Sequence, residues 1–248
     1  MKLSKELPIF SLLPDRIHIW LFRLEDPDRA YPVWERSLSV VERERSKQYK
    51  FESDRLRFIA RRGLLRQLLG RYSGIPPAGI SYQIDPYGKP SLPSSPFSFN
   101  LSSSQDRIAF AFSLGKDIGV DIECVRPLPD LIRVAERWFS QHELTGLLDL
   151  PMDLQLEAFY HVWTQKEAFM KARGQGLSYP LHDFSVSVDP GQPGRLLSIK
   201  EDLEQAAHWK MATTAETGWR AAVCVRAEAE PEFLWHEPGL AEFMASTR

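Results

Sequence analysis

The chain is short of the features that would place it outside the cell or in a membrane. It has two cysteines in 248 residues, too few for a disulfide framework, and Cys124 and Cys224 lack the spacing of a metal site. No apolar run approaches the roughly 18 residues that span a bilayer. The segment Met1–Pro8 lacks the apolar core of a secretion signal. We therefore expect a cytoplasmic protein with no membrane partner.

The chain also lacks a charge excess of either sign. Its formal net charge is −2, with 26% charged and 43% hydrophobic residues, which is typical of an ordinary soluble globular protein. We therefore expect no nucleic-acid partner, and any phosphate binding must come from a local basic cluster. One helix is rich in arginine, and such a run is more often a solvent-exposed face than a binding site. Its arginines are Arg55, Arg57, Arg61, Arg62, Arg66 and Arg71.

Two acidic residues stand at the end of a strand-like run, Ile118–Glu123. Because a strand alternates its side chains, Asp121 and Glu123 share one face and Val120 and Ile122 the opposite, buried face. Neighbouring carboxylates resist joint ionisation unless a cation neutralises them, and oxygen ligands suit Mg²⁺. Taken alone, however, such a pair is more often a solvated strand end.

A helix downstream supplies a third acid. Glu167 and Lys171 stand four residues apart on one helical face, an arrangement that is often a plain surface ion pair. Gly174 and Gly176 follow directly, and glycines there can end a helix and let backbone approach a bulky ligand. The sequence therefore predicts a metal site beside a ligand-binding loop.

These residues resemble the motifs of a known family. Gly119–Glu123 is similar to the G-[IV]-D-[IVL]-E motif of 4′-phosphopantetheinyl transferases, and Trp163–Leu177 to their W-x-x-K-E-A-x-x-K-x-x-G-x-G-L motif. Tyr87–Pro90 and Phe99–Ser102 also look like family segments. The resemblance covers roughly residues 40–226 and is to the large, surfactin-synthetase-activating type.

The resemblance implies an activity and roles for the acids. It implies Mg²⁺-dependent transfer of the 4′-phosphopantetheine arm of coenzyme A to a serine of an apo acyl or peptidyl carrier protein, with release of 3′,5′-ADP. Asp121, Glu123 and Glu167 would hold the metal. Glu167 would also accept the proton of the serine, and Lys171 would stabilise the departing 3′,5′-ADP.

The resemblance also implies contacts with coenzyme A, which is here a co-substrate. Arg62, Lys89, Ser102, Ser103 and Lys171 would bind it. One departure is visible, because Ser103 stands where the family usually has a histidine that donates to a coenzyme A phosphate. A serine can donate a hydrogen bond but cannot carry a positive charge. We expect weaker coenzyme A binding or compensation by a neighbouring basic group.

The expected fold class is α+β. Helices are expected at residues 54–72 and 153–173, and strands at residues 107–114 and 117–123 form an expected hairpin across Gly115-Lys116. Helices come before strands in each half of this prediction. The resemblance implies two similar lobes, residues 1–113 and 114–248, related by a pseudo-twofold axis, with the active site in the cleft between them. No role is evident for residues 228–248.

Two other functions use the same residues. A non-catalytic module that binds a carrier protein or nucleic acid would use the arginine-rich helix and need no ordered acids. A Mg²⁺-dependent nucleotide hydrolase would use the same carboxylates with water as the nucleophile. We expect the protein to act as a monomer.

Overall fold

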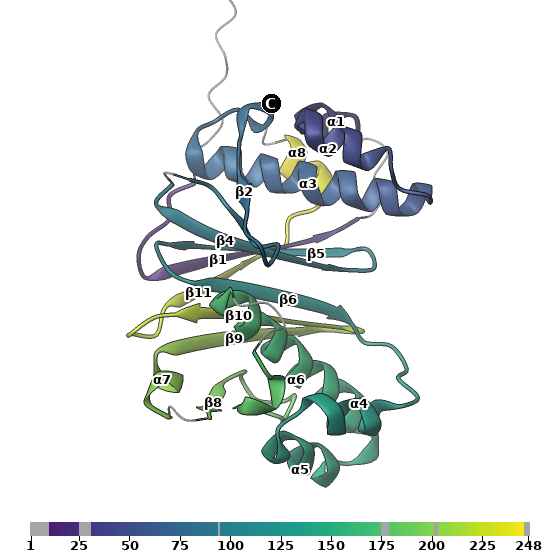
Figure 1. The fold of residues 1–248 in the computed structure, drawn as a ribbon, viewed down its shortest axis with the longest axis vertical. Coiled ribbons are helices and arrows are strands. Elements are labelled where there is room, and N and C mark those ends of the chain that lie inside the picture. Colours follow the sequence, from purple (N-terminus) through teal and green to yellow (C-terminus); the bar gives the residue numbers. More distant parts are fainter. Residues whose placement is uncertain (1–9, 25–30, 94, 175–178, 201–202, 246–248) are drawn as a thin grey trace, which may run out of the picture.

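The computed structural model describes residues 10–24, 31–93, 95–174, 179–200 and 203–245. It stacks four layers, with helices outside and two β-sheets inside (Figure 1). The predicted α+β class is confirmed. None of the helices in these ranges is long and apolar enough to cross a membrane.

The first sheet has four strands in the order β11-β1-β5-β4. These are β11 (Glu232–His236), β1 (Arg16–Arg23), β5 (Arg107–Leu114) and β4 (Phe97–Ser104). β1 runs parallel to β11 and antiparallel to β5, and β4 is antiparallel to β5. Among the described residues β1 precedes every helix, and in the second half of the chain β6 (Ile118–Cys124) precedes α4 (Leu131–Trp138), so the expected order of helices before strands is wrong for both halves.

Helices cover the outer face of this sheet (Figure 1). They are α1 (Tyr31–Ser37), α2 (Val40–Ser46), α3 (Glu52–Ser73) and α8 (Leu240–Ala245). The middle and C-terminal part of α3 is buried, and its leucines pack on the phenylalanines of β4 and β5 in one core cluster. Gly74 ends α3 at a φ of 72°, the left-handed conformation that glycine adopts without strain.

The second sheet has three antiparallel strands in the order β6-β10-β9. They are β6 (Ile118–Cys124), β10 (Trp219–Arg226) and β9 (Trp209–Glu216). Two small ladders complete the strands: β2 (Gln83–Ile84) with β3 (Pro90–Ser91), and β7 (Phe184–Val186) with β8 (Leu196–Ile199).

A second helical layer covers the outer face of the second sheet (Figure 1). It contains α4 (Leu131–Trp138), α5 (Gln141–Asp149), α6 (Met152–Arg173) and α7 (Leu203–Ala207). Short 3₁₀ turns lie at Pro77–Gly79 and Leu181–Asp183. Of these helices, α6 packs most extensively on the sheet, against β6 and β10.

The two sheets pack face to face over an apolar cluster of their own. β1 and β5 contribute Ile17, Ile19, Leu21, Ala109 and Ala111, and β6 and β10 contribute Ile118, Val120, Ile122, Ala221, Val223 and Val225. The expected hairpin between β5 and β6 is therefore wrong, because these strands belong to different sheets. β5 is buried along six successive residues, so both of its faces need a partner layer, and β6 supplies one from the second sheet.

The end of the chain returns to the first sheet. β11 pairs with β1, and Phe243 of α8 is buried against Phe22 and Trp20. Sequence patterns gave no role for this stretch, because a short edge strand and a short helix leave little periodicity. The boundary after residue 113 stays a prediction.

A polar group is buried where β11, β1 and α3 meet. The hydroxyl of Tyr72 lies 2.8 Å from Nδ1 of His18 and accepts a hydrogen bond from the Trp20 indole at 2.9 Å. With the oxygen accepting from Trp20, the hydroxyl proton is available to a neutral His18 ring. The His236 ring lies 5.3 Å from the His18 ring. Burial, aided by His236, lowers the pKa of His18 to about 4.

We predict that this histidine makes folding stability depend on pH. Between the unfolded pKa near 6.5 and the folded pKa of about 4, the unfolded chain binds more protons, so stability falls as pH falls. Urea unfolding at pH 7 and pH 5 should show about 2 kcal/mol of extra loss in the wild type relative to His18→Gln. Equal losses in the two proteins would contradict the assignment.

Candidate active site

β6 presents its two faces to different surroundings, as its alternation predicts. Val120 and Ile122 are buried in the cluster between the sheets. The other face meets α6 at Gly119, where a Cβ atom would lie 2.1 Å from the carbonyl oxygen of Ala168. Only glycine permits this approach, which brings the backbone of α6 onto the strand that carries the acids.

Side chains of β4 bond to β6 along the line where the two sheets meet. Every second residue of β4 takes part, in the way that strand alternation requires. Asn100 Oδ1 accepts from the Val120 amide at 3.0 Å, the Ser102 hydroxyl donates to Asp121 Oδ1 at 2.7 Å, and the Ser104 hydroxyl donates to Glu123 Oε2 at 2.8 Å. We call this row of contacts the β4–β6 seam. It fixes both acids from the first sheet.

Lys171 completes the surroundings of Asp121. Its ammonium donates to Asp121 Oδ1 at 2.6 Å and to the Ser102 hydroxyl at 3.0 Å. Asp121 is only 2% exposed, and its second oxygen, Oδ2, is buried without a hydrogen-bond partner. A buried carboxylate oxygen without a donor is costly, so this atom is suited to a further cation or proton.

The remaining acids are close enough to influence one another. Burial raises the pKa of Glu123, and the charge of Asp121 raises it further. Burial also raises the pKa of Glu167, an effect that Lys171 opposes and that Asp121 and Glu123 reinforce. α6 and β6 therefore bring the three predicted acids into one electrostatic group.

The donor set fits a hard cation, because it offers carboxylate oxygens that include the orphaned Oδ2 of Asp121. Within the described ranges, however, no group of three or more His, Cys, Asp or Glu side chains is arranged to hold a metal ion. Lys171 acts as the counter-charge of Asp121 in this arrangement. The three-carboxylate magnesium site therefore stays a prediction.

A cleft of about 520 Å³ lies beside these acids. Four of the predicted site residues line it: Arg62, Lys89, Glu167 and Lys171. Ser102 and Asp121 bond to Lys171, and Glu123 bonds to Ser104 in the same seam. Ser103 lines a separate side pocket. Arg61 and Asn100 also line the cleft, although sequence reasoning had not singled them out.

Lys89 occupies a position between the cleft and the end of α6. Its ammonium donates to the carbonyl oxygens of Lys171 at 2.9 Å and Ala172 at 3.1 Å, and burial lowers its pKa. Gly174 ends α6 in the left-handed conformation, as predicted. Gly176 and Leu177, the last two residues of the motif quoted above, lie outside the described residues.

The arginine-rich helix is only partly a solvent-exposed face. Arg66 and Arg71 are buried, and Arg66 Nε donates to Glu42 at 2.6 Å. The expectation of an exposed face is wrong for these two residues, because α2 covers Arg66 and α8 covers Arg71, whose Nη2 donates to the Phe243 carbonyl at 2.7 Å. Arg62 Nη1 donates to the Tyr82 hydroxyl at 3.1 Å, and its guanidinium lies over the rings of Tyr82 and Phe58.

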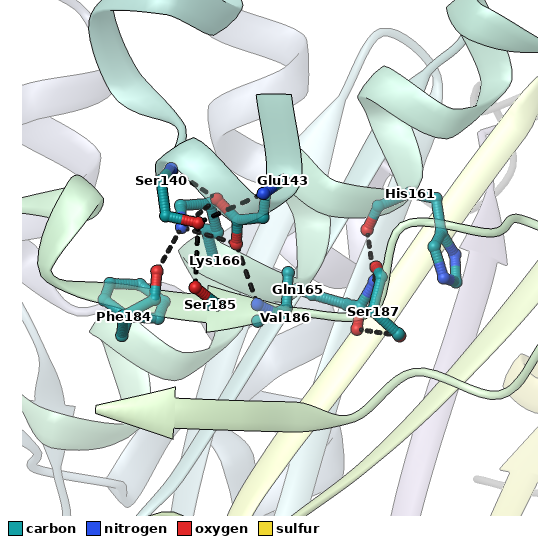
Figure 2. A network of polar contacts seen from close by, with 9 residues as sticks. All are labelled: Ser140, Glu143, His161, Gln165, Lys166, Phe184, Ser185, Val186 and Ser187. Carbon is teal, nitrogen blue, oxygen red and sulfur yellow. Dashed lines mark hydrogen bonds and ion pairs between the residues drawn. The ribbon is translucent and has the colours of Figure 1, made fainter. Parts of the chain in front are cut away.

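A buried ion pair anchors α6 next to Glu167 (Figure 2). Lys166 and Glu143 are both fully buried, with 0% side-chain exposure. The ammonium of Lys166 donates to both oxygens of Glu143 at 2.7 and 2.6 Å and to the Phe184 carbonyl at 2.8 Å. Glu143 also accepts from the amides of Ser140 and Val186, so it closes the capping box that begins α5 at Ser140 and also bonds to β7.

Acidic side chains beside a basic cleft define a site suited to a phosphorylated ligand. A family model of the 4′-phosphopantetheinyl transferase superfamily matches residues 117–224. The 4′-phosphopantetheinyl transferase HetI of Nostoc sp. is 33% identical over 92% of this chain and 95% of its own length. The transferase Sfp of Bacillus subtilis is 32% identical over 79% of this chain and 84% of its own length.

A solved structure, the holo-(acyl-carrier-protein) synthase from Bacillus anthracis in complex with CoA (3′,5′-ADP), aligns with 46% of this chain and with 96% of the synthase chain. The TM-score is 0.38 and the sequence identity is 20%. The sequence relatives, not this partial structural match, show the family. The chain belongs to the 4′-phosphopantetheinyl transferase superfamily.

We predict that Lys166→Met destabilises the fold strongly. The substitution leaves Glu143 as a buried charge without its cation, which typically costs about 3–5 kcal/mol. Chemical denaturation monitored by circular dichroism measures the loss. The double variant Lys166→Met, Glu143→Gln should recover part of it, because no buried charge remains. A single variant as stable as the wild type would rule out a structural role for the pair.

Proposed function

We propose that this protein transfers the 4′-phosphopantetheine arm of coenzyme A to a serine of an apo acyl or peptidyl carrier protein and releases 3′,5′-ADP. The observation that carries the proposal is the gathering of Asp121, Glu123, Glu167 and Lys171 beside a basic cleft. In the reaction the serine oxygen bonds to the β-phosphorus of coenzyme A. The bond from that phosphorus to the bridging oxygen of the pyrophosphate breaks.

Glu167 is the proposed general base of this reaction. It lines the cleft, and burial raises its pKa, which makes it a better proton acceptor than an exposed carboxylate. A serine hydroxyl is a poor nucleophile, and a positioned base typically contributes about 10²- to 10⁴-fold to such a step. Glu167 would take the hydroxyl proton as the oxygen attacks.

Asp121, Glu123 and Glu167 are the proposed ligands of Mg²⁺, with the orphaned Oδ2 of Asp121 as the strongest indication. When bound, the ion would neutralise charge that develops on the phosphate oxygens. Lys171 would place its ammonium near the departing 3′,5′-ADP, because it stands one helical turn beyond Glu167 and lines the same cleft.

Arg62, Lys89, Ser102 and Ser103, with Lys171, are the proposed contacts of coenzyme A. Arg62 and Lys89 line the cleft and supply positive charge for the phosphates. Ser102 links Lys171 to Asp121, so its contribution would pass through the position of that ammonium. Ser103 lines the adjoining pocket.

We further propose two related lobes, residues 1–113 and 114–248, with a pseudo-twofold axis between them. Each lobe would carry a 22-residue helix, α3 or α6, on the outer face of its main sheet. The last segment of the second lobe, β11 and α8, would cross over to complete the first lobe, where β11 pairs with β1. Both helices end at a left-handed glycine, Gly74 at a φ of 72° and Gly174 at 69°. A cytoplasmic monomer is also part of the proposal, and both cysteines are free.

One experiment separates the proposed function from its alternatives. The protein is mixed with coenzyme A, Mg²⁺ and an apo carrier protein, and the intact mass of the carrier is measured. A gain of one phosphopantetheine group on the carrier serine supports the transferase. Cleavage of coenzyme A without this gain would indicate a hydrolase. A complex with carrier or nucleic acid that forms without metal and without a mass gain would indicate a binding module.

We predict that Glu167→Gln abolishes transfer while it largely preserves the fold. The amide keeps the shape of the side chain but can neither accept the serine proton nor supply a full negative charge. Asp153→Asn is the matched control, because it removes an exposed acid from the first turn of the same helix. Wild-type turnover by Glu167→Gln, measured as initial rate of carrier modification, would remove Glu167 from the mechanism.

A further inference from the structure

Arg62 lines the main cleft from α3, with two aromatic rings beside its guanidinium. The central carbon of the guanidinium lies 5.7 Å from the ring centre of Phe58 and 5.8 Å from that of Tyr82. A cation is attracted to the face of an aromatic ring, but this attraction does little to set the direction of its N–H donors. The rings therefore hold the charge in place, and a hydrogen bond is needed to orient the planar group.

The Tyr82 hydroxyl supplies that hydrogen bond. Arg62 Nη1 donates to the Tyr82 oxygen at 3.1 Å, and the same hydroxyl donates to Glu42 Oε1 in a short hydrogen bond. A phenol that gives its proton to a carboxylate is a better acceptor, because the hydrogen bonds of a chain polarise one another. One hydroxyl thus connects the arginine of the cleft to a carboxylate behind it.

Glu42 is itself fixed by several parts of the fold. Its Oε2 accepts from Arg66 Nε at 2.6 Å and from the Ser39 amide at 2.9 Å, which is part of the capping box of α2. Arg66 Nη1 also donates to the carbonyl oxygens of Pro77 and Ile80, both at 2.9 Å. Glu42 and Arg66 are buried, with 8% and 2% exposure. The acceptor of the phenol proton is therefore held by charge-assisted hydrogen bonds inside the protein.

The charge states agree with this direction of the hydrogen bonds. Burial raises the pKa of Tyr82 to about 12, although Arg62 opposes the shift, so the phenol keeps its proton. Burial also acts to raise the pKa of Glu42, but the hydrogen bond from Tyr82 and the amide and guanidinium contacts just described lower it overall. Glu42 is therefore an anionic acceptor, and Tyr82 is a neutral donor to it.

The contact between Tyr82 and Arg62 also joins two walls of the cleft. Tyr82 directly precedes β2, and the turn between β2 and β3 places Gly88 and Lys89 on the wall opposite α3 in sequence, where they line the same cleft as Arg62. A change at the Tyr82 hydroxyl would therefore act on the cleft without touching its lining, because Tyr82 is not one of the residues that line it.

We propose that Tyr82 is a positioning residue, which orients the Arg62 guanidinium toward the phosphates of coenzyme A through the hydrogen bond that it makes to Glu42. This inference rests on the proposed function, in which Arg62 contacts coenzyme A. The Tyr82 oxygen accepts from one of the five N–H donors of the guanidinium, so the contact leaves the others for a ligand. A guanidinium oriented before the ligand arrives loses less freedom on binding.

Isothermal titration with coenzyme A tests the proposal. In Tyr82→Phe the affinity should fall about 3- to 10-fold, because the variant keeps the ring but loses one hydrogen bond to a charged group. Tyr160→Phe is the matched control, with wild-type affinity expected. It removes a phenol hydroxyl that bonds to the Arg126 carbonyl, and Tyr160 does not line the cleft. In carrier modification, Tyr82→Phe should raise the KM for coenzyme A and leave kcat nearly unchanged.

A double-variant cycle separates orientation of Arg62 from a general effect on the fold. Arg62→Gln should weaken coenzyme A binding by itself. The addition of Tyr82→Phe to Arg62→Gln should then cause little further loss, because no guanidinium remains to be oriented. If Tyr82 supported the cleft only by packing, the two losses would add.

Three results would overturn the inference while the proposed function stands, all in a wild type that modifies carrier proteins. Tyr82→Phe binds coenzyme A as tightly as the wild type, or its loss adds fully to that of Arg62→Gln, or Tyr160→Phe loses as much affinity as Tyr82→Phe. A wild type that binds no coenzyme A and modifies no carrier would instead overturn the proposed function, and this inference with it.

Discussion

The site depends on the β4–β6 seam. Neighbouring strands in one sheet hold each other by backbone hydrogen bonds, but β4 and β6 belong to different sheets, and polar side chains of β4 form the contacts instead. Through these contacts the hydroxyls of Ser102 and Ser104 hold side by side two carboxylates that repel each other.

α6 carries Glu167 and Lys171, which lie beside this seam. Three contacts fix the position of the helix. Gly119 lets the helix backbone approach β6, the buried Lys166–Glu143 pair ties its middle to α5 and β7, and Lys89 caps its last carbonyls. Glu167 and Lys171 lie within the segment that these contacts hold. The acid and the ammonium are therefore placed by packing that does not depend on a ligand, which is what preorganised catalysis requires.

Much of this site could be predicted from the sequence, because it is encoded locally. The alternation of Val120–Glu123 and the spacing of Glu167 and Lys171 follow directly from strand and helix periodicity. Arg61, Asn100 and the partners of β5 could not be found in this way. Their roles depend on which sheet each strand joins and on contacts between residues far apart in the chain. The apolar run of β5 predicted a strand but not that it would pack between two layers.

Our proposal that Asp121 and Glu123 of the seam and Glu167 of α6 hold one divalent ion can be tested directly. Mn²⁺, a paramagnetic substitute for Mg²⁺, can be titrated into the protein in the presence of coenzyme A and followed by electron paramagnetic resonance. We predict one bound ion for each chain, and loss of that ion in Asp121→Asn, which removes the charge but keeps the shape of the side chain. A wild type that binds no ion, or an Asp121→Asn variant that binds it with unchanged affinity, would contradict the account.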